Sequence, residues 1–290
     1  MAKVAFLGLG AMGFPMAGYL ASKGGHEVTV FNRTASKSAD WVKKYGGHSA
    51  ESPTAAAQGK DFVFSCVGND DDLRSVTMGK DGAFQAMKAG TVYVDHTTAS
   101  AKVARELNDA ARSHGIGFVD APVSGGRLGA ERGTLTIMCG GSEEHYGLVK
   151  PILESSYARA ITLLGPNGSG QLTKMVNQIC LVGLIEGLSE GLHFAQKSGL
   201  NIENVIEAIS KGSAQSWQME NHWKPMSEGR FDFGFAVEWM RKDLSICLDE
   251  ARRNGASLPG TALIDNFFSE IERMGGARWD TSSLLARLNR

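Results

Sequence analysis

The sequence predicts an α/β protein in which an N-terminal doubly wound parallel sheet of the Rossmann type is followed by an all-α C-terminal domain. From the start to about residue 165, short apolar runs alternate with helix-like stretches, which is typical of βαβ units. Strand signals stop after Gly165-Pro166-Asn167, and the 290 residues exceed the usual size of one core. We therefore expect a dinucleotide-binding domain over residues 1–165 and an all-α substrate and dimerisation domain over residues 166–290.

The apolar runs of the first half are expected to be strands of this parallel sheet, with helices between most of them. They are Lys3–Leu7, Glu27–Phe31, Phe62–Cys66, Thr91–Val94, Gly117–Asp120, Leu135–Cys139 and Ala160–Leu163. The second half predicts helices over Ser169–Ser198, Ile202–Lys211, Phe235–Asn254, Leu258–Met274 and from Ser282 onward. The segments Ser213–Trp223 and Phe231–Phe235 are rich in aromatic residues and are expected to be irregular.

Composition excludes several classes of function. A formal net charge of −1 gives no general attraction to nucleic acid or anionic lipid. The four cysteines are far apart and lack the spacing of a metal or redox site, so we expect core thiols in a reducing compartment and no bound metal. No apolar run resembles a signal peptide or a membrane span, which predicts a cytoplasmic protein without a membrane partner.

The first predicted strand runs directly into a glycine-rich turn that opens the helix Pro15–Ser22. The turn is Gly8-Leu9-Gly10-Ala11-Met12-Gly13, the G-x-G-x-x-G spacing of dinucleotide-binding sites. In such sites one glycine forms the turn, one lets the backbone approach a pyrophosphate and one packs the helix against the sheet. A glycine-rich structural turn is the alternative, but the position after a strand favours a dinucleotide site.

The end of the second predicted strand indicates which dinucleotide is bound. NAD-binding proteins usually place an acidic residue there, about 20 residues beyond the glycines, to bind the ribose 2′-hydroxyl. This chain has Asn32-Arg33-Thr34 instead, with no carboxylate to repel a 2′-phosphate and a guanidinium that can bind one. We expect NADP, with NAD as the alternative and a solvated surface arginine as the simpler interpretation of Arg33.

Two further strand ends lie where ligands bind in doubly wound folds. Cys66 and Val67 lie at the end of one strand. Thr97 and Thr98 lie at the end of the next, where their hydroxyls can bond to ribose or nicotinamide. His96 and His114 lack a carboxylate nearby in sequence that would orient them, so ordinary polar or loop roles are expected for both.

Two other segments carry candidate chemistry. Ser124, Gly125 and Gly126 follow a strand and can expose successive backbone N–H groups beside a hydroxyl, an arrangement that suits a substrate carboxylate. Lys174 and Asn177 lie three residues apart on one face of an otherwise apolar helix. Partial burial disfavours the charged form of a lysine, so that its amine can take part in proton transfer. The alternative is that Lys174 only extends its amine from a core helix to water, as a lone lysine more often does.

Several ordered segments together resemble the β-hydroxyacid dehydrogenase family, which includes 3-hydroxyisobutyrate dehydrogenase, tartronate semialdehyde reductase and the glyoxylate and succinic semialdehyde reductases. The resemblance covers nearly the whole chain. It is carried by Gly8–Gly13 with Pro15–Ala17, Asp120–Gly126, Gly133–Thr136, Gly140-Gly141, Gly168–Asn177 and Lys242–Leu244. Gln178 stands where a second asparagine is frequent and Thr97 where serine is usual, differences that bear on substrate choice more than on chemistry.

The resemblance implies roles for particular residues. Lys174 would be the catalytic acid and base, while Asn177 and the Ser124–Gly126 amides would hold the substrate. Thr98 would contact the cofactor, and Lys242 would close over the nicotinamide. The two aromatic-rich segments would shape the far wall of the substrate pocket, with core or dimer contacts as alternatives.

The expected activity is hydride transfer between a nicotinamide cofactor and a short hydroxy acid or its semialdehyde, by a homodimer or homotetramer. An imine reductase of the same architecture is the rival enzyme, but that resemblance is poorer because those proteins generally lack the lysine found here at position 174. A catalytically silent cofactor-binding module is the non-enzymatic alternative. The particular substrate, the physiological direction and the choice between dimer and tetramer stay open at this level.

Overall fold

The computed structural model describes residues 1–289 and divides into two compact units. The first comprises Met1–Lys174, and the second begins at Met175. The units join inside the long helix α8 (Ser169–Lys197), beyond the end of the predicted first domain. Among the described residues, no helix is long and apolar enough to cross a membrane.

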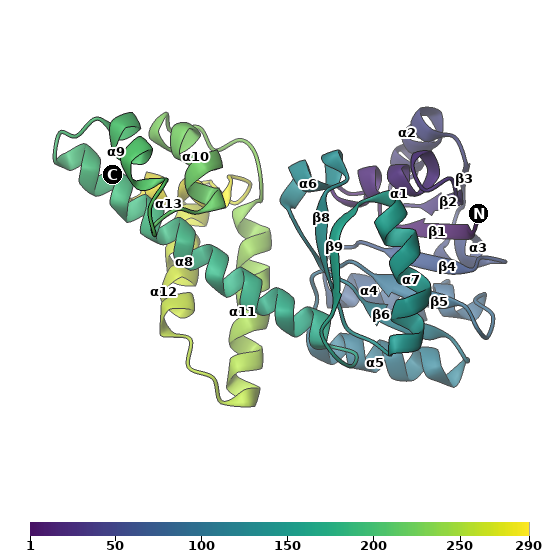
Figure 1. The fold of residues 1–290 in the computed structure, drawn as a ribbon. Coiled ribbons are helices and arrows are strands. Elements are labelled where there is room, and N and C mark those ends of the chain that lie inside the picture. The colour runs from purple at the N-terminus through teal and green to yellow at the C-terminus, as the bar shows by residue number, and fades with distance from the viewer. Residues whose placement is uncertain (290) are drawn as a thin grey trace. The chain divides into compact units, whose positions relative to one another are not determined.

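The first unit is built on a six-stranded parallel sheet with the order β3-β2-β1-β4-β5-β6 (Figure 1). This is the doubly wound order of dinucleotide-binding folds. The strands are β1 (Lys3–Leu7), β2 (Glu27–Phe31), β3 (His48–Ser49), β4 (Phe62–Ser65), β5 (Val92–Asp95) and β6 (Gly117–Asp120). The predicted fold class is confirmed, and the two-residue edge strand β3 is an addition to it.

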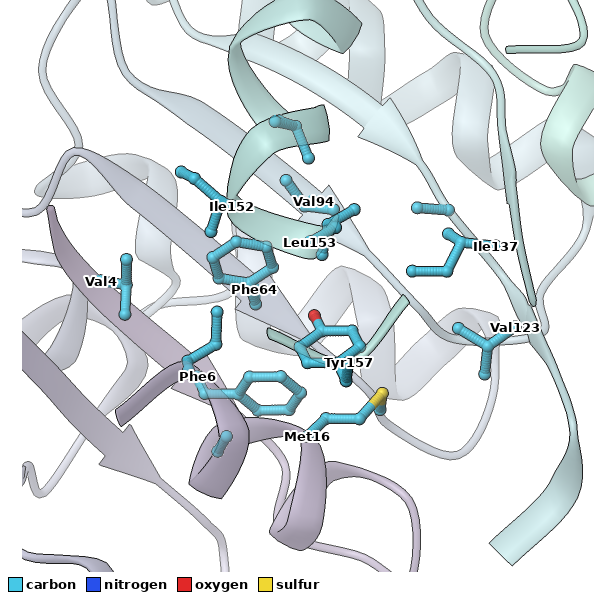
Figure 2. Close-up of a cluster of buried hydrophobic side chains, with 14 of the residues drawn as sticks. Val4, Phe6, Met16, Phe64, Val94, Val123, Ile137, Ile152, Leu153 and Tyr157 are labelled. Atoms are coloured by element: carbon cyan, nitrogen blue, oxygen red, sulfur yellow. The ribbon is translucent and has the colours of Figure 1, made fainter. Parts of the chain in front are cut away.

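Helices cover both faces of this sheet because its strands are apolar on both sides. In β1, Val4 and Phe6 belong to one buried cluster and Ala5 and Leu7 to another, following the two-residue period of a strand. Figure 2 shows the first cluster, in which Met16 of α1 and Leu153 of α7 pack with Phe6 and Phe64. The helices of this unit are α1 (Gly13–Ser22), α2 (Ala35–Tyr45), α3 (Pro53–Ala57), α4 (Asp70–Met78), α5 (Ala101–Ser113), α6 (Gly126–Arg132) and α7 (Glu143–Ser156), with a short 3₁₀ helix, η1 (Ala83–Gln85).

The last two predicted strands do not extend the parallel sheet, and this part of the prediction was wrong. They are β8 (Leu135–Cys139) and β9 (Ala158–Leu163), which form a separate three-stranded sheet with β7 (Val123–Ser124). The β7–β8 pair is antiparallel, whereas β8 and β9 are parallel. The chain returns from β7 to its antiparallel partner β8 through helix α6, a connection that a βαβ pattern in the sequence does not reveal.

The second unit is helical and contains two apolar clusters. In one, Val182 and Ile185 of α8 pack with Met240 of α11 and Phe268 of α12. The other contains Leu188 and Leu192 of α8 together with residues of α9, α10 and α13. Besides α8, its helices are α9 (Ile202–Ile209), α10 (Trp217–Ser227), α11 (Val237–Asn254), α12 (Pro259–Arg273), the 3₁₀ helix η2 (Thr281–Ser283) and α13 (Leu284–Leu288).

Helix α10 corrects the expectation that residues 213–223 are irregular. The Ser216 side chain accepts a hydrogen bond from Met219 N and so caps the helix at its N-terminus. Met219 and Met226 are buried on its inner face. The serine three residues before Met219 was the available signal, but the aromatic residues and Pro225 obscured it.

The cysteines also differ in part from the expected core thiols. Cys139 and Cys247 are buried, whereas Cys66 is half-buried at the end of β4 and Cys180 is exposed on α8. The apolar sequence around Cys180 did not predict its exposure, because one helix presents both a buried and a solvent-facing side.

Candidate active site

The first turn places its three glycines in three different environments. Gly8 has φ +96°, and a Cβ there would lie 2.3 Å from Cys66 O. A Cβ on Gly13 would lie 1.9 Å from Gly8 O, so this glycine lets α1 pack against the turn. Gly10 has no atom within 4 Å of its Cβ position, which leaves open space beside the backbone. One glycine makes the turn, one packs it and one faces space that a ligand can occupy.

The N-terminus of α1 suits an anion. No side chain caps it, and Ala11 and Met12 lie directly before the first helical residue. Uncapped amides and the helix dipole favour a bound phosphate at this position. The turn itself is held from β2, because Leu9 N donates to Asn32 Oδ1 at 2.8 Å.

Arg33 lies just beyond β2 with a side chain that is 88 % exposed. Its guanidinium is 3.4 Å from Asp72 Oδ1, and an ion pair this exposed holds an arginine only weakly. Thr34 follows as the residue before α2, and its side chain does not cap that helix. Arg33 can therefore exchange its carboxylate partner for a phosphate group at small cost.

The ends of β4 and β5 are hydrogen-bonded to each other. Val67 N donates to Thr97 Oγ1 at 3.0 Å, and Asp95 Oδ1 accepts from Ser65 Oγ at 2.8 Å and Thr97 N at 3.0 Å. Burial raises the pKa of the Asp95 carboxyl to about 7, although these hydrogen bonds oppose the shift. The next residue, Thr98, is half-buried at this edge. The predicted cofactor residues at the two strand ends thus form one connected edge.

His96 is not the polar surface or loop residue that the sequence predicted. It is 2 % exposed, with Nδ1 2.6 Å from Ala121 O and Nε2 2.7 Å from Tyr157 Oη. Because a carbonyl can only accept, Nδ1 carries the proton and Nε2 accepts from the tyrosine hydroxyl. Burial lowers the pKa of His96 to about 4, so the ring is neutral and has a structural role. His114, by contrast, is exposed at the end of α5, as expected.

The sequence did not assign a role to Asp120, the last residue of β6. Its carboxylate accepts hydrogen bonds from Gly168 N at 2.8 Å and Gln171 N at 3.0 Å, at the start of α8. Burial raises the pKa of Asp120 to about 6 against the effect of these amides. Lys174, one turn further along α8, is 8 % exposed, which agrees with a largely desolvated amine. The Asp-x-x-x-Ser-Gly-Gly segment contained this residue, but nothing local indicated that it binds a helix some fifty positions later.

Ser124 to Gly126 lie between β7 and α6. Ser124 is half-buried and pairs in register with Thr136 of β8. Gly125 has φ +129° and Gly126 φ +60°, both in the region that side chains disfavour. The sharp turn that was predicted from these glycines is present, and its backbone geometry requires glycine.

In the second unit, the predicted site residues Asn177 and Lys242 each lie beside a buried polar side chain of α8 or α11. Asn177 Nδ2 donates to Gln178 Oε1 at 2.9 Å, and Gln178 Nε2 donates to Asp243 Oδ2 at 2.6 Å. Lys242 Nζ lies 3.1 Å from Asp243 Oδ1. Gln178 was expected only as a departure from the family pattern and Asp243 had no expected role, yet these two buried side chains orient the Asn177 amide.

Within the first unit, parallel pairing brings the predicted residues to one edge. β1 pairs with β2 and β4, and β4 with β5, so their carboxyl ends lie side by side. Ligands bind at this edge in doubly wound folds. The strand order and the glycine turn define a dinucleotide-binding protein of the Rossmann class.

Comparisons with known proteins narrow this class. Residues 3–165 match the family described as the NAD binding domain of 6-phosphogluconate dehydrogenase. Residues 168–288 match the family described as NAD-binding of NADP-dependent 3-hydroxyisobutyrate dehydrogenase. The chain belongs to the β-hydroxyacid dehydrogenase family and is an NAD(P)-dependent oxidoreductase.

Individual relatives are similar to this protein along nearly the whole chain. An uncharacterized oxidoreductase of Shewanella frigidimarina is 62 % identical, with 100 % of this chain and 99 % of the relative covered. The 2-hydroxy-3-oxopropionate reductase of Escherichia coli is 36 % identical, with 99 % and 97 % covered. The solved structure of Mycobacterium tuberculosis 3-hydroxyisobutyrate dehydrogenase with L-serine has a TM-score of 0.90 and 29 % identity over 100 % of both chains.

Proposed function

We propose that this enzyme transfers hydride between NADP(H) and a short hydroxy acid or its semialdehyde, with Lys174 as the proton donor and acceptor. The observation that carries the proposal is the placement of Lys174. Lys174 is 8 % exposed, and it follows a helix start that is hydrogen-bonded to the carboxyl end of β6. Burial disfavours the ammonium form and suits a lysine to reversible proton transfer.

The residues of the first turn fit a dinucleotide. The space beside Gly10 admits a pyrophosphate, and the uncapped N-terminus of α1 supplies amide donors to it. When bound, the nicotinamide cofactor gives or accepts the hydride. Thr98 then lies half-buried at the strand end where ribose or nicotinamide groups can be bound, whereas Thr97 is buried and its hydroxyl binds Val67 N.

Proton transfer at Lys174 Nζ completes the reaction in either direction. During reduction, the ammonium protonates the alkoxide oxygen as it forms at the former carbonyl. During oxidation, the neutral amine takes the hydroxyl proton as the hydride leaves the same carbon. One side chain therefore serves as acid in one direction and as base in the other.

The remaining predicted residues have groups that can bind a carboxylate on the substrate. The Ser124 hydroxyl and the amides of Gly125 and Gly126 offer donors to an anion, and Asn177 offers an amide. Fixing the carboxylate holds the reacting carbon in line with the cofactor, and such orientation is a large part of catalysis. The name of the Escherichia coli relative, 2-hydroxy-3-oxopropionate reductase, denotes a short carboxylated aldehyde of this kind.

The preference for NADP rests on Arg33. Its exposed guanidinium follows β2, and no carboxylate occupies the neighbouring positions 32 and 34. The match of the second half to a family described as NADP-dependent supports the same choice. We expect Arg33→Ala to weaken NADPH binding by about 10-fold, equivalent to about 1.4 kcal/mol, and to leave NADH binding unchanged. An equal loss for both cofactors would contradict the choice of NADP.

We also propose that the enzyme is a homo-oligomer that buries one face of α8. This face carries the exposed side chains of Val176, Leu184 and Phe194, and the exposed Gly187 and Gly191 lie between them. Apart from the adjacent backbone of α8 itself, no described atom lies within 4 Å of a Cβ placed on either glycine. Phe194→Glu should yield a monomer in light scattering, whereas Leu148→Glu on α7 should not change the mass. A wild-type monomer would contradict the proposal.

The first experiment is cofactor oxidation with a panel of short carboxylated aldehydes. NADPH and NADH are each assayed with glyoxylate and with succinic, tartronate and methylmalonate semialdehydes, using wild type and Lys174→Ala. We expect NADPH-dependent turnover that falls at least 1,000-fold in the variant, within the range attributed to acid–base catalysis, with NADPH affinity nearly unchanged. Loss of turnover and of cofactor affinity to the same extent would exclude Lys174 as the acid and base.

A further inference from the structure

The helix that carries Lys174 begins without a side-chain cap of its own. Gly168, the residue before Ser169, has no side chain and takes φ +93°. Helices usually satisfy the amide of their third residue with a Ser, Thr, Asp or Asn at this position. Here Asp120 supplies the missing acceptor from β6, because its carboxylate binds both Gly168 N and Gln171 N.

Gln171 ties the same turn to the end of β5. Its Oε1 accepts from Ala99 N at 3.1 Å, and its Nε2 donates to Thr97 O at 2.7 Å. Both the Gln171 and Asp120 side chains are fully buried. The first turn of α8 is therefore fixed by four hydrogen bonds, two to Asp120 of β6 and two to the segment that follows β5.

Two glycines make this close approach feasible. A Cβ on Gly140 would lie 2.6 Å from Asp120 Oδ1, and one on Gly170 would lie 2.5 Å from Met138 O and 2.8 Å from Asp120 Oδ2. Either side chain would force the helix away from the carboxylate. These glycines account for two conspicuous motifs, Gly140-Gly141 and Gly168-Ser169-Gly170, that the proposed reaction does not itself use.

We propose that Asp120 and Gln171 are positioning residues that fix Lys174 Nζ relative to the carboxyl edge of the sheet. The inference rests on the proposed function of Lys174 and adds the means by which its amine is placed. Residues 171 and 174 lie on the same face of the helix, so fixing the first fixes the second. The placement matters because a displacement of about 1 Å at a reacting group can reduce catalysis by about 100-fold.

Gln171→Leu and Asp120→Asn test the inference by separating kcat from cofactor affinity. Leucine removes both side-chain hydrogen bonds of Gln171, and asparagine turns an N–H₂ group toward a backbone donor. We expect kcat for NADPH oxidation with the best panel aldehyde to fall by about 10- to 100-fold in each variant. NADPH affinity, measured by nicotinamide fluorescence, should stay within 2-fold of wild type because the first turn is untouched.

Gln171→Glu provides a readout that a merely structural role would not give. A protonated glutamic acid can donate to Thr97 O and accept from Ala99 N, as glutamine does, whereas its carboxylate cannot donate. The buried Asp95 of β5 and Asp120 of β6 are the acidic neighbours at this turn, and both disfavour a further negative charge. Relative to wild type at each pH, the kcat of this variant should approach normal near pH 6 and fall to the Gln171→Leu level near pH 9.

Combination with Lys174→Ala distinguishes positioning from a general loss of structure. If Gln171 acts through Lys174, adding Gln171→Leu to Lys174→Ala should change the residual single-turnover rate by less than 3-fold. Thr77→Val, which removes a buried hydroxyl from α4, is the matched control and should keep wild-type kcat.

Two results overturn the inference alone, namely wild-type kcat in Gln171→Leu or the same 10- to 100-fold loss in the Lys174→Ala background. Wild-type kcat in Lys174→Ala itself would instead overturn the proposed function. Should Asp120→Asn fail to fold, the Gln171 variants decide the question.

Discussion

Two strand-to-helix turns of the first unit, Gly8–Gly13 at the start of α1 and Gly168–Gly170 at the start of α8, use similar glycine spacing for opposite purposes. The N-terminus of α1 has no side-chain cap, and Gly10 borders open space. The start of α8 is bound by the Asp120 carboxylate and the Gln171 side chain. A helix start that is left open can bind a ligand, whereas one that is capped from another strand fixes the residues that follow it.

Among the tests of this comparison, the largest effect is expected from Gly13→Ala, which tests whether the first turn depends on close packing. The added Cβ would lie 1.9 Å from Gly8 O, so the turn must move. We expect NADPH affinity to fall by about 100-fold, equivalent to about 2.7 kcal/mol. Fluorescence titration measures the affinity. Gly147→Ala on α7, where a Cβ meets nothing within 4 Å, is the control and should bind normally. Normal NADPH binding by Gly13→Ala would show that the turn tolerates the shift.

Gly170→Ala applies the same kind of change to the second turn and should give the opposite pattern. The Cβ would lie 2.5 Å from Met138 O, which pushes the start of α8 away from Asp120. We expect kcat to fall by about 30-fold through displacement of Lys174, with NADPH affinity retained. Steady-state kinetics and fluorescence titration together measure this. If cofactor affinity fell as far as kcat, the two turns would not be functionally separate.

Gly10→Ala sharpens the comparison because it should weaken cofactor binding without changing the stability of the fold. Nothing in the chain lies within 4 Å of the new methyl group, and Gly10 does not adopt a positive φ. Stability should therefore change by less than about 0.5 kcal/mol. The methyl group would occupy the space proposed for the pyrophosphate, so NADPH affinity should fall by about 10-fold, or about 1.4 kcal/mol. Unchanged affinity would place the dinucleotide elsewhere.

The smallest expected effect is a pH dependence of stability at the β5–β6 edge, where buried titratable groups lie. Burial lowers the pKa of His96 to about 4 in the folded protein. Between pH 6.5 and 4 the unfolded chain therefore binds more protons at this residue, and stability falls as the pH falls. From pH 6.5 to 5.5 the wild type should lose about 1 kcal/mol more stability than His96→Gln.

Urea unfolding at both pH values measures this difference. The neighbouring Asp95, whose pKa is raised to about 7, has the opposite sign because its folded form holds its proton to higher pH. Taking the difference between wild type and variant removes the contribution of Asp95. Equal losses in the two proteins would show that His96 is already protonated or accessible in the folded state.

Much of the fold and part of the site follow from short-range patterns in the sequence. The first-turn glycines, the strand ends at Val67 and Thr97, and the helix that carries Lys174 each depend on residues within a few positions of one another. Apolar periodicity and glycine spacing record such local preferences directly. The bounds of β1, β2, β6 and β8 match the predicted ones for this reason. The assignments of Lys174, Asn177 and Ser124–Gly126 to roles in the reaction remain predictions.

Tertiary structure decided the features that depend on distant partners. Asp120 binds amides 48 and 51 positions away, and His96 binds Tyr157 across 61 positions. The separate sheet of β7, β8 and β9 arises because Val123–Ser124 pairs with β8 instead of extending the first sheet. The sequence alone determined where strands, helices and the glycine turn lie, because backbone preference and burial pattern are local properties. The hydrogen-bond partners of a buried carboxylate or imidazole depend on the tertiary structure, because folding removes water from these groups. They must then bond to other groups of the chain, which lie far away in the sequence.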